Sequence, residues 1–388
     1  MAAIHSFRVP PIVFGRGAAA QAGEEVKKAG VKKGLIVSDP VIAKLPVLED
    51  IGDSLGRSGL QFTLYDGVDA EPTLEMVEEG LGIFKREGCD FVIAIGGGSA
   101  IDAAKAVSVM ATNTGAIDDF QGADKIARAG VPMAAVPTTA GTGSEVTPYT
   151  IITDTRRNVK MLISSPLVMP RLAIVDPLLT LSMPRGLTAA TGIDALTHAI
   201  EAYVSVKAQP MSDIFALSAI ELISGSLRQA WSNGNNQEAR EKTMLGALQA
   251  GIAFSNSSVA LVHGMSRPIG AYFHVAHGVS NAALLSVVTE FSLIGNPERY
   301  ARIAKAMGEN IEGLTVLEAS DVAAEAIARL IEDIEIPTLP ELGVEEEKLD
   351  KLAPQMAEDA IASGSPANNP RQATKEEIVE LYKLAYAQ

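Results

Sequence analysis

Residues 91–100 read FVIAIGGGSA, and this stretch decides the fold. An apolar, β-forming run leads directly into three glycines and a serine, and residues 99–110 then carry apolar side chains at helical spacing. A strand, a glycine-rich turn and a helix in this order suit an anion, because glycines admit a phosphate and the helix N-terminus favours its charge. The spacing differs from G-x-G-x-x-G, so an ordinary glycine turn is the alternative.

Further β-rich runs lie on both sides of this stretch, and longer helical stretches such as residues 73–87 separate them. This alternation is typical of βαβ units that build a parallel sheet. We therefore expect an α/β, Rossmann-like domain with a parallel sheet over residues 1–182. The further runs are residues 34–37, 62–65, 133–136 and 172–175.

The pattern changes after Asp176-Pro177, where long stretches with helical periodicity follow one another and no comparable β-rich run recurs. We expect an all-α second domain over residues 183–388, with the boundary near Pro184. The main helical stretches are residues 187–206, 211–231, 237–254 and 315–334.

The composition excludes several classes of protein. The 388 residues include 32 Lys and Arg against 47 Asp and Glu, a net charge of -15, and no basic run, which argues against nucleic acid as a partner. No stretch approaches about 18 uninterrupted apolar residues, and the first residues do not resemble a secretory signal. The single cysteine, Cys89, forms no internal disulfide. We expect a cytoplasmic protein with no membrane or nucleic-acid partner.

A second loop strengthens the prediction of a nucleotide site. Residues 137–145 read PTTAGTGSE and follow the strand predicted at 133–136, so glycines and hydroxyls gather at the ends of two strands. Ligands of open α/β sheets bind at this edge, and a dinucleotide would use both loops. Asp39 ends an early strand, where a carboxylate accepts hydrogen bonds from ribose hydroxyls and disfavours NADP; its alternative role is to begin the turn before Pro40.

The helical half contains a candidate metal site. Asp194 and His198 stand at i and i+4 on one predicted helix, so both reach one side of it. Taken alone, the pair also fits a surface carboxylate beside a core histidine. Two further histidines, His263 and His277, complete a mixed oxygen and nitrogen set suited to Fe, Zn, Mn or Co, with room for a substrate oxygen. We expect Pro268 and Gly270 to break the helix between them.

With these motifs in order, the sequence closely resembles the iron-containing, or group III, alcohol dehydrogenases over essentially its whole length. The resemblance implies that Asp194, His198, His263 and His277 bind one divalent metal, Fe²⁺ first, with Zn²⁺ or Mn²⁺ as alternatives. It implies a Rossmann-like domain, a helical domain and a homodimer or higher oligomer formed through a strand near residues 12–14. The matching motifs are Phe14-Gly15, residues 96–99 with Asp102, residues 137–145, Asp176-Pro177, the Asp194/His198 helix, the His263 and His277 segments and residues 369–371.

The resemblance also assigns cofactor and substrate residues. Gly97, Gly98 and Ser99 would hold the pyrophosphate of NAD, Lys160 would lie near the nicotinamide ribose, and Phe254 would help form the wall of the substrate pocket. NADP is the less favoured cofactor. The candidate cofactor-binding residues are Asp39, Gly96, Gly97, Gly98, Ser99, Asp102, Thr138, Thr139, Thr142, Thr147 and Lys160.

Two positions depart from the family pattern. Glu71-Pro72 stands where many members have Asn-Pro, and Arg267 stands where many have a second histidine four residues after His263. Arg267 either pairs with a carboxylate of the protein or clamps an anionic group of the substrate, which would select aldehydes that bear a carboxylate, sulfonate or phosphate.

These features predict an enzyme that transfers hydride between a nicotinamide cofactor and a small primary alcohol or its aldehyde, with the metal polarising the oxygen. Water or His274 would return the proton during reduction. The alternatives are a polyol dehydrogenase resembling glycerol dehydrogenase, a cyclising lyase resembling dehydroquinate synthase, and a non-catalytic nucleotide-binding protein. The lyase needs basic residues around a phosphorylated substrate, and only Lys160 and Arg267 stand near the motifs. The four-residue ligand set argues against a non-catalytic protein.

Overall fold

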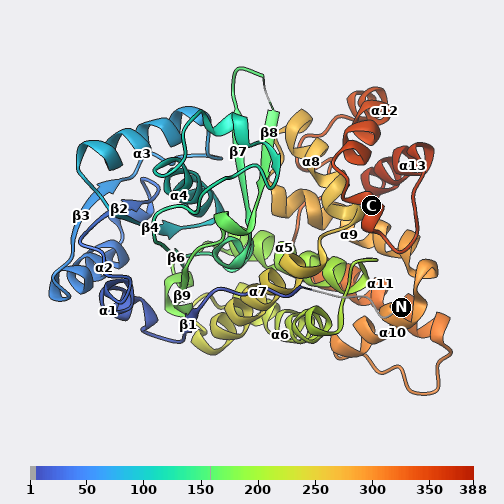
Figure 1. Ribbon diagram of the computed structural model, residues 1–388. Coiled ribbons are helices and arrows are strands. Elements are labelled where there is room, and N and C mark those ends of the chain that lie inside the picture. Colours follow the sequence, from blue (N-terminus) through green and yellow to red (C-terminus); the bar gives the residue numbers. More distant parts are fainter. Residues whose placement is uncertain (1–5, 158) are drawn as a thin grey trace. The chain divides into compact units, whose positions relative to one another are not determined.

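The chain folds into two compact units, and the computed structural model describes residues 6–157 and 159–388 (Figure 1). The first unit is Val9–Leu181 and holds a parallel sheet with helices. The second unit holds Ser182–Gln388, and its described residues form helices without a strand. This architecture confirms the predicted fold class. Residues 6–8 belong to the second unit, where Phe7 stacks on Phe215 with ring centroids 5.8 Å apart.

A six-stranded parallel sheet organises the first unit, in the order β1-β9-β6-β4-β2-β3. The five strands predicted from β-rich runs all belong to it, and β1 adds an edge strand beside β9. Because β4 lies beside β6, the two glycine-containing loops that follow them are neighbours. The strands are β1 (Ile12–Phe14), β2 (Lys33–Val37), β3 (Gln61–Tyr65), β4 (Phe91–Gly96), β6 (Met133–Pro137) and β9 (Leu172–Val175).

Side chains that alternate along the strands fill two cores, one on each face of the sheet. Leu35 and Val37 contribute to the core under α3 (Leu74–Arg86) and α4 (Gly98–Met110), and Ile36 points to the opposite core. That second core packs against α1 (Ala22–Lys27) and α2 (Pro46–Arg57). Figure 1 shows these helix pairs on opposite sides of the sheet. Burial on both faces explains why the central strands are continuous apolar runs.

A small second sheet in the same unit was not predicted. Strand β7 (Tyr149–Asp154) pairs antiparallel with β8 (Val159–Ser164), and β5 (Gly122–Ala123) pairs with β8 in parallel. Buried and more accessible residues alternate along β7, which makes its sequence less apolar than that of the central strands. A half-exposed strand of this kind gives a weaker signal than a fully buried one.

Helix α5 (Arg185–Val204) forms the core of the second unit, and it is buried almost throughout its C-terminal part. It carries Asp194 and His198 in a buried environment. The other helices are α6 (Pro210–Ser232), α7 (Gln237–Ser257), α8 (Leu261–Phe273), α9 (His277–Ser292), α10 (Pro297–Ala306), α11 (Val316–Asp333), α12 (Glu346–Ala362) and α13 (Lys375–Tyr386).

The predicted helix break at Pro268 and Gly270 is wrong. Helix α8 continues through both residues and ends at Phe273, and the next residue, His274, has a φ of 58° in the left-handed region. A proline inside a helix removes one backbone hydrogen bond. Pro268 and the neighbouring Ile269 are buried, so their packing offsets this loss. The break between His263 and His277 therefore lies at residues 274–276, later than expected.

One described helical segment, His277–Gly295, is long and apolar enough to cross a membrane by composition alone. The bent pair α7 and α8 passes the same test only when both helices are counted as one span. Most of His277–Gly295 is buried against other parts of the chain, and the core helices of globular proteins share this composition. Its apolar character is therefore accounted for by packing within the helical unit.

The only tryptophan of the chain, Trp231, lies near the end of α6. The guanidinium carbon of Arg185, the first residue of α5, stands 3.9 Å from the centre of its ring. A cation in this position is attracted by the ring quadrupole. The contact joins the start of α5 to the end of α6.

Candidate metal and cofactor sites

Three helices of the second unit bring the predicted metal ligands together. Asp194 and His198 share one face of α5, His263 lies in the first turn of α8, and His277 begins α9. One oxygen, Asp194 Oδ1, lies 3.8 Å from His198 Nδ1, 3.7 Å from His263 Nε2 and 3.8 Å from His277 Nε2. Three imidazoles thus surround one carboxylate oxygen, and Asp194, His263 and His277 form a mutually close group that does not include His198.

His198 has the environment of a neutral nitrogen ligand. Its Nδ1 is buried and has no hydrogen-bond partner among the described residues. Burial lowers the pKa of His198 to about 3, so the ring keeps a lone pair at neutral pH. Phe254 stacks on the imidazole with centroids 4.3 Å apart, and His263 lies at the same centroid distance on a tilted plane. A buried lone pair without a partner is unfavourable unless a donor or a metal completes it.

Glu201, which sequence reasoning missed, orients His263. Its Oε2 lies 2.7 Å from His263 Nδ1 and accepts a hydrogen bond from the N–H of Ala260, and its Oε1 accepts one from the N–H of Val262. Burial alone would lower the pKa of His263, but Glu201 and Asp194 raise it. A proton held on Nδ1 leaves the Nε2 lone pair directed toward Asp194. The signal was present, because Glu201 follows His198 by three residues on the same helix face.

Asn281 is the second missed residue. Its Nδ2 donates to Asp194 Oδ1 at 2.7 Å and lies 3.2 Å from His263 Nε2 and 3.3 Å from His277 Nε2. Its Oδ1 is buried and lacks a hydrogen-bond partner in the described part of the chain. Asn281 stands four residues after His277 on α9, the same spacing that relates Asp194 and His198. A search for any polar side chain at this spacing would have found it.

These residues fit a divalent cation. Burial by itself would raise the pKa of Asp194, but the surrounding histidines hold this pKa well below its usual range, so the carboxylate is ionised. One anionic oxygen and three imidazoles are ligands that iron, zinc and manganese accept. Oxygen and nitrogen atoms of Asp194, His263 and His277 all lie within 4.8 Å of one another.

The two predicted cofactor loops of the first unit also meet. Gly96 pairs with Pro137 across β4 and β6, and the N–H of Thr138 donates to Gly96 O at 3.0 Å. A Cβ added at Gly98 would lie 2.9 Å from Thr142 Cγ2, whereas one added at Gly97 would lie 3.5 Å from Thr139. Glycine at 98 therefore permits the close approach of the loops.

Asp39 reaches both the turn and the glycine loop. Its Oδ1 accepts hydrogen bonds from the N–H groups of Val41 and Ile42, each at 2.9 Å, as expected for a residue that begins a turn. Its Oδ2 would lie 3.4 Å from a Cβ added at Gly96. The two interpretations of Asp39 are therefore compatible, since one oxygen stabilises the turn and the other faces the loop.

A buried lysine holds the second loop by hydrogen bonds. Lys105 on α4 donates to Ser144 Oγ at 2.8 Å, to Thr147 Oγ1 at 3.0 Å and to Tyr149 O at 2.6 Å. Asp102 accepts from Ser144 Oγ and from the N–H of Ile151. Asp102 and Thr147, predicted as cofactor residues, thus hold the loop in place through contacts within the unit.

Two family models together cover most of the chain. The model described as iron-containing alcohol dehydrogenase matches residues 10–177, and the C-terminal model of the Fe-containing alcohol dehydrogenase family matches residues 188–386. The chain belongs to the iron-containing alcohol dehydrogenase family. The resemblance inferred from sequence motifs is confirmed.

Individual relatives of this alcohol dehydrogenase match it over nearly its full length. The NAD-dependent methanol dehydrogenase of Bacillus methanolicus is 40% identical, with 98% of this chain and 99% of the relative covered. The lactaldehyde reductase of Escherichia coli strain K12 is 41% identical, with 96% and 97% covered. The crystal structure of a 1,3-propanediol oxidoreductase superimposes with a TM-score of 0.96 at 40% identity, covering 99% of this chain and all of that one.

Glu71, one of the two departures from the family pattern, contacts a predicted cofactor residue. Lys160 Nζ donates to Glu71 Oε1 at 2.6 Å, and both side chains are partly exposed. Such a pair contributes little to stability because solvent screens it. In this alcohol dehydrogenase, its consequence is that the ammonium of Lys160 is held by a carboxylate of the same unit.

Arg267 and His274 have different environments in the helical unit. Arg267 lies one turn after His263 on α8 and is partly enclosed, and burial lowers its pKa while Glu201 opposes this shift. No hydrogen bond or ion pair joins its guanidinium to any residue that the structure describes. His274 is exposed and follows the last residue of α8, and its N–H donates to Gly270 O at 3.1 Å. Its predicted role in proton return remains a prediction.

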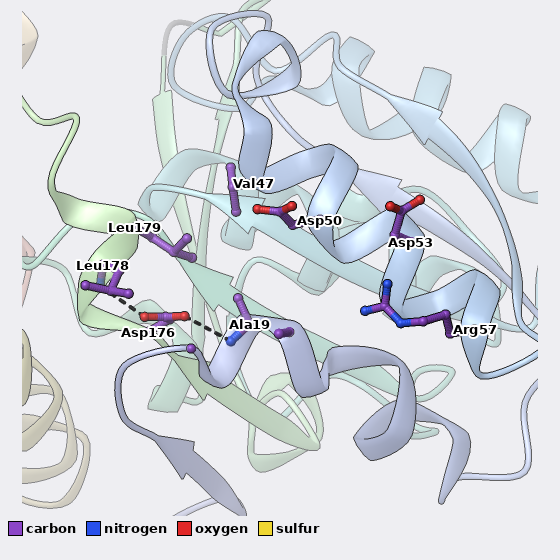
Figure 2. A pocket seen from close by; sticks show the side chains of 10 residues that line it. Ala19, Val47, Asp50, Asp53, Arg57, Asp176, Leu178 and Leu179 are labelled. Atoms are coloured by element: carbon purple, nitrogen blue, oxygen red, sulfur yellow. Dashed lines mark hydrogen bonds between the residues drawn. The ribbon is translucent and has the colours of Figure 1, made fainter.

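A surface pocket of about 350 Å³ lies elsewhere in the α/β unit (Figure 2). Its lining contains none of the predicted cofactor residues. Asp176 of the Asp-Pro motif accepts hydrogen bonds there from the N–H groups of Ala19 and Leu178, as the dashed lines in Figure 2 show. The motif therefore joins the turns that follow β1 and β9. The lining residues are Gly17, Ala19, Ala20, Val47, Asp50, Asp53, Arg57, Asp176, Leu178 and Leu179.

Proposed function

We propose that this chain interconverts a small primary alcohol and its aldehyde by exchanging hydride with NAD(H), with one divalent metal held by Asp194, His198, His263 and His277. The observation that carries the proposal is the convergence of three imidazole nitrogens within 3.8 Å of Asp194 Oδ1. Membership of the family and relatives that act on methanol, lactaldehyde and 1,3-propanediol support a small substrate.

The metal, when bound, supplies a Lewis acid that polarises the substrate oxygen. Residues of the chain prepare the site for this role. Glu201 keeps a proton on His263 Nδ1 and so directs the Nε2 lone pair inward, while Phe254 holds the ring of His198 by stacking. The buried environment of these side chains strengthens electrostatic interactions by excluding water.

NAD is the proposed cofactor, and the two glycine-containing loops support it. Backbone N–H groups at the start of α4 suit the pyrophosphate, and the carboxylate of Asp39 beside Gly96 suits ribose hydroxyls better than a 2′-phosphate. In this proposal Lys160 lies at the nicotinamide ribose. The NAD dependence of the methanol dehydrogenase relative points in the same direction.

Ferrous iron is the proposed metal, with Zn²⁺ and Mn²⁺ as alternatives, because the donor set accepts all three and cellular supply selects among them. We also propose a cytoplasmic homodimer or larger homo-oligomer. The short strand β1 supports it, since this strand lies at the edge of the sheet and, among the described residues, pairs there with β9 alone.

A reconstitution experiment tests the proposal. NADH oxidation with a small neutral aldehyde is measured on chelator-stripped protein and on the same protein reloaded anaerobically with Fe²⁺, and metal content is measured in parallel. Activity is expected only after reloading. Asp194→Asn should lose both metal and activity, whereas Asp321→Asn, on the exposed side of α11, should retain both. Full activity of the stripped protein would contradict the proposal.

A further inference from the structure

We propose that Arg267 binds an anionic group at the far end of the substrate, so that this enzyme prefers short aldehydes bearing a carboxylate, sulfonate or phosphate. The inference rests on the function proposed above and specifies its substrate class. Three properties of Arg267 support it, namely its place on α8, its partial enclosure without a partner among the described residues, and the charge balance of the proposed metal site.

The helix places Arg267 beside the site. Residues four apart share one face of a helix, so Arg267 projects from the same side of α8 as His263. The electrostatic influence of Glu201, which contacts His263 Nδ1, reaches Arg267 as well. The two side chains begin roughly 6 Å apart along the helix, so both can contact one small substrate.

The guanidinium is partly enclosed and has no partner among the described residues. Arginines that stabilise a fold are usually bound, as Arg240 is by Thr188 Oγ1 at 2.8 Å and by Gly234 O at 3.0 Å. Arg267 has no such contact with residues 6–157 or 159–388, although burial is sufficient to lower its pKa. The side chain is half-buried and its nitrogens keep access to solvent, so a guanidinium without a protein partner is available to an anion from outside the chain.

The charges nearby point to the same ligand. Asp194 and Glu201 carry the two buried carboxylates of the cluster, and together they balance one divalent cation. The positive charge of Arg267 then remains uncompensated in the loaded enzyme. A guanidinium presents paired N–H groups that match the two oxygens of a carboxylate, sulfonate or phosphate.

Matched substrates and variants test the proposal in the metal-loaded enzyme. We compare kcat/KM for a short aldehyde ending in a carboxylate or sulfonate with that for a neutral aldehyde of equal length. Arg267→Met should lower kcat/KM for the charged aldehyde roughly 30-fold to 1000-fold and leave the neutral one within about threefold. Arg267→Lys keeps the positive charge but lacks the paired N–H groups. Its kcat/KM for the charged aldehyde should lie between those of the wild type and Arg267→Met. Arg329→Met, at a partly exposed position on α11, is the control.

Two binding measurements separate this role from others. Ethanesulfonate should bind the NAD-loaded enzyme in calorimetry, and Arg267→Met should abolish this heat. The dissociation constant of NADH should be unchanged in that variant. A higher constant would assign Arg267 to the cofactor phosphates and overturn the proposal. Equal losses on charged and neutral aldehydes would also overturn it. Failure of the wild-type enzyme on both aldehydes would instead contradict the proposed function.

Discussion

Glu201 acts on the proposed metal site through another residue. It accepts hydrogen bonds from two backbone N–H groups at the start of α8 and contacts His263 Nδ1, so one carboxylate fixes both the helix entry and the orientation of a ligand. Partners of this kind raise the basicity of a metal-bound histidine and determine which nitrogen carries the proton. Metal affinity in this protein should therefore depend on a residue outside the ligand set.

Replacing Glu201 with Gln should weaken metal binding by roughly 10-fold to 100-fold, because a neutral amide no longer stabilises the proton on His263 Nδ1. Competition with a chromogenic chelator measures this affinity. Glu221→Gln on the exposed side of α6 is the matched control and should bind metal as the wild type does. An unchanged affinity in Glu201→Gln would show that Glu201 only supports the fold.

Sequence spacing predicted which four side chains would come together but not their surroundings. Asp194 and His198 could be paired because helix geometry fixes an i, i+4 relation, and His263 and His277 were predicted to join them because the chain has only five histidines. The sequence did not predict Glu201 and Asn281 at the site because glutamate and asparagine are common. Only the packing of α5 against α8 and α9 shows which of them face inward. The unpaired state of Arg267 likewise depends on residues distant in sequence.

At the scale of elements, the loops after β4 and β6 depend on small side chains for their contact. Gly98 stands against Thr142, whose Oγ1 also accepts from the N–H of Ser144 at 3.2 Å. Gly97 has more space, with Thr139 at ordinary contact distance from an added Cβ. The two glycines therefore serve different purposes, since one permits loop packing and the other leaves backbone accessible.

Gly98→Ala should destabilise the protein by about 1–3 kcal/mol through overpacking against Thr142. Adding Thr142→Ser removes the methyl group in conflict and should restore part of the loss. Gly97→Ala should leave the free energy of unfolding unchanged but weaken the binding of NADH, because the added methyl group would lie where the phosphate approaches. Denaturant unfolding and NADH fluorescence titration measure the two effects. Strong NADH binding by Gly97→Ala would contradict a phosphate site there.

The same loop contains a buried carboxyl whose ionisation opposes folding. Burial raises the pKa of Glu145 from 4.5 to about 7, although its own backbone N–H and Lys105 act in the opposite direction. The unfolded chain therefore releases this proton first as the pH rises. The contribution of Glu145 to stability is fully present below pH 4.5 and declines as the pH approaches 7.

Glu145→Gln should become more stable relative to the wild type as the pH rises from 4.5 to 7, by an amount on the order of 2 kcal/mol. Denaturant titrations at several pH values give this difference directly. Glu24→Gln, at an exposed position on α1, should show no comparable trend. A difference that does not change with pH would mean that Glu145 is ionised throughout.

Elements with strong local signals were predicted, and those shaped by long-range packing were not. The five apolar strands are buried on both faces of the sheet and appear as continuous runs in the sequence. The β7–β8 hairpin was missed because its strands alternate and are partly exposed. Local propensity predicts a helix break at Pro268 because it does not include the burial that keeps α8 intact.

At the scale of the whole molecule, the proposed metal and cofactor residues fall in different units. The ligands belong to Ser182–Gln388, and the loop residues belong to Val9–Leu181. Each unit has its own buried core, so each ligand should stabilise mainly the unit that binds it. Two separate thermal transitions are compatible with this organisation.

Removal of the metal should lower the transition of the helical unit and leave that of the α/β unit in place. Excess metal at 100 times its dissociation constant stabilises the binding unit by about 2.7 kcal/mol. Scanning calorimetry with and without chelator measures this shift, and NADH should bind the stripped protein. Loss of NADH binding on chelation would contradict the independence of the two sites.

The contact between Arg185 and Trp231 gives the protein an intrinsic fluorescence probe. Because the sequence has a single tryptophan and it lies in the helical unit, selectively excited indole emission comes from that unit alone. The contact between the guanidinium and the ring is lost when α5 separates from α6, so the emission spectrum changes when this helix pair separates. Stopped-flow recordings of that signal would time the unfolding of the helical unit without any attached dye.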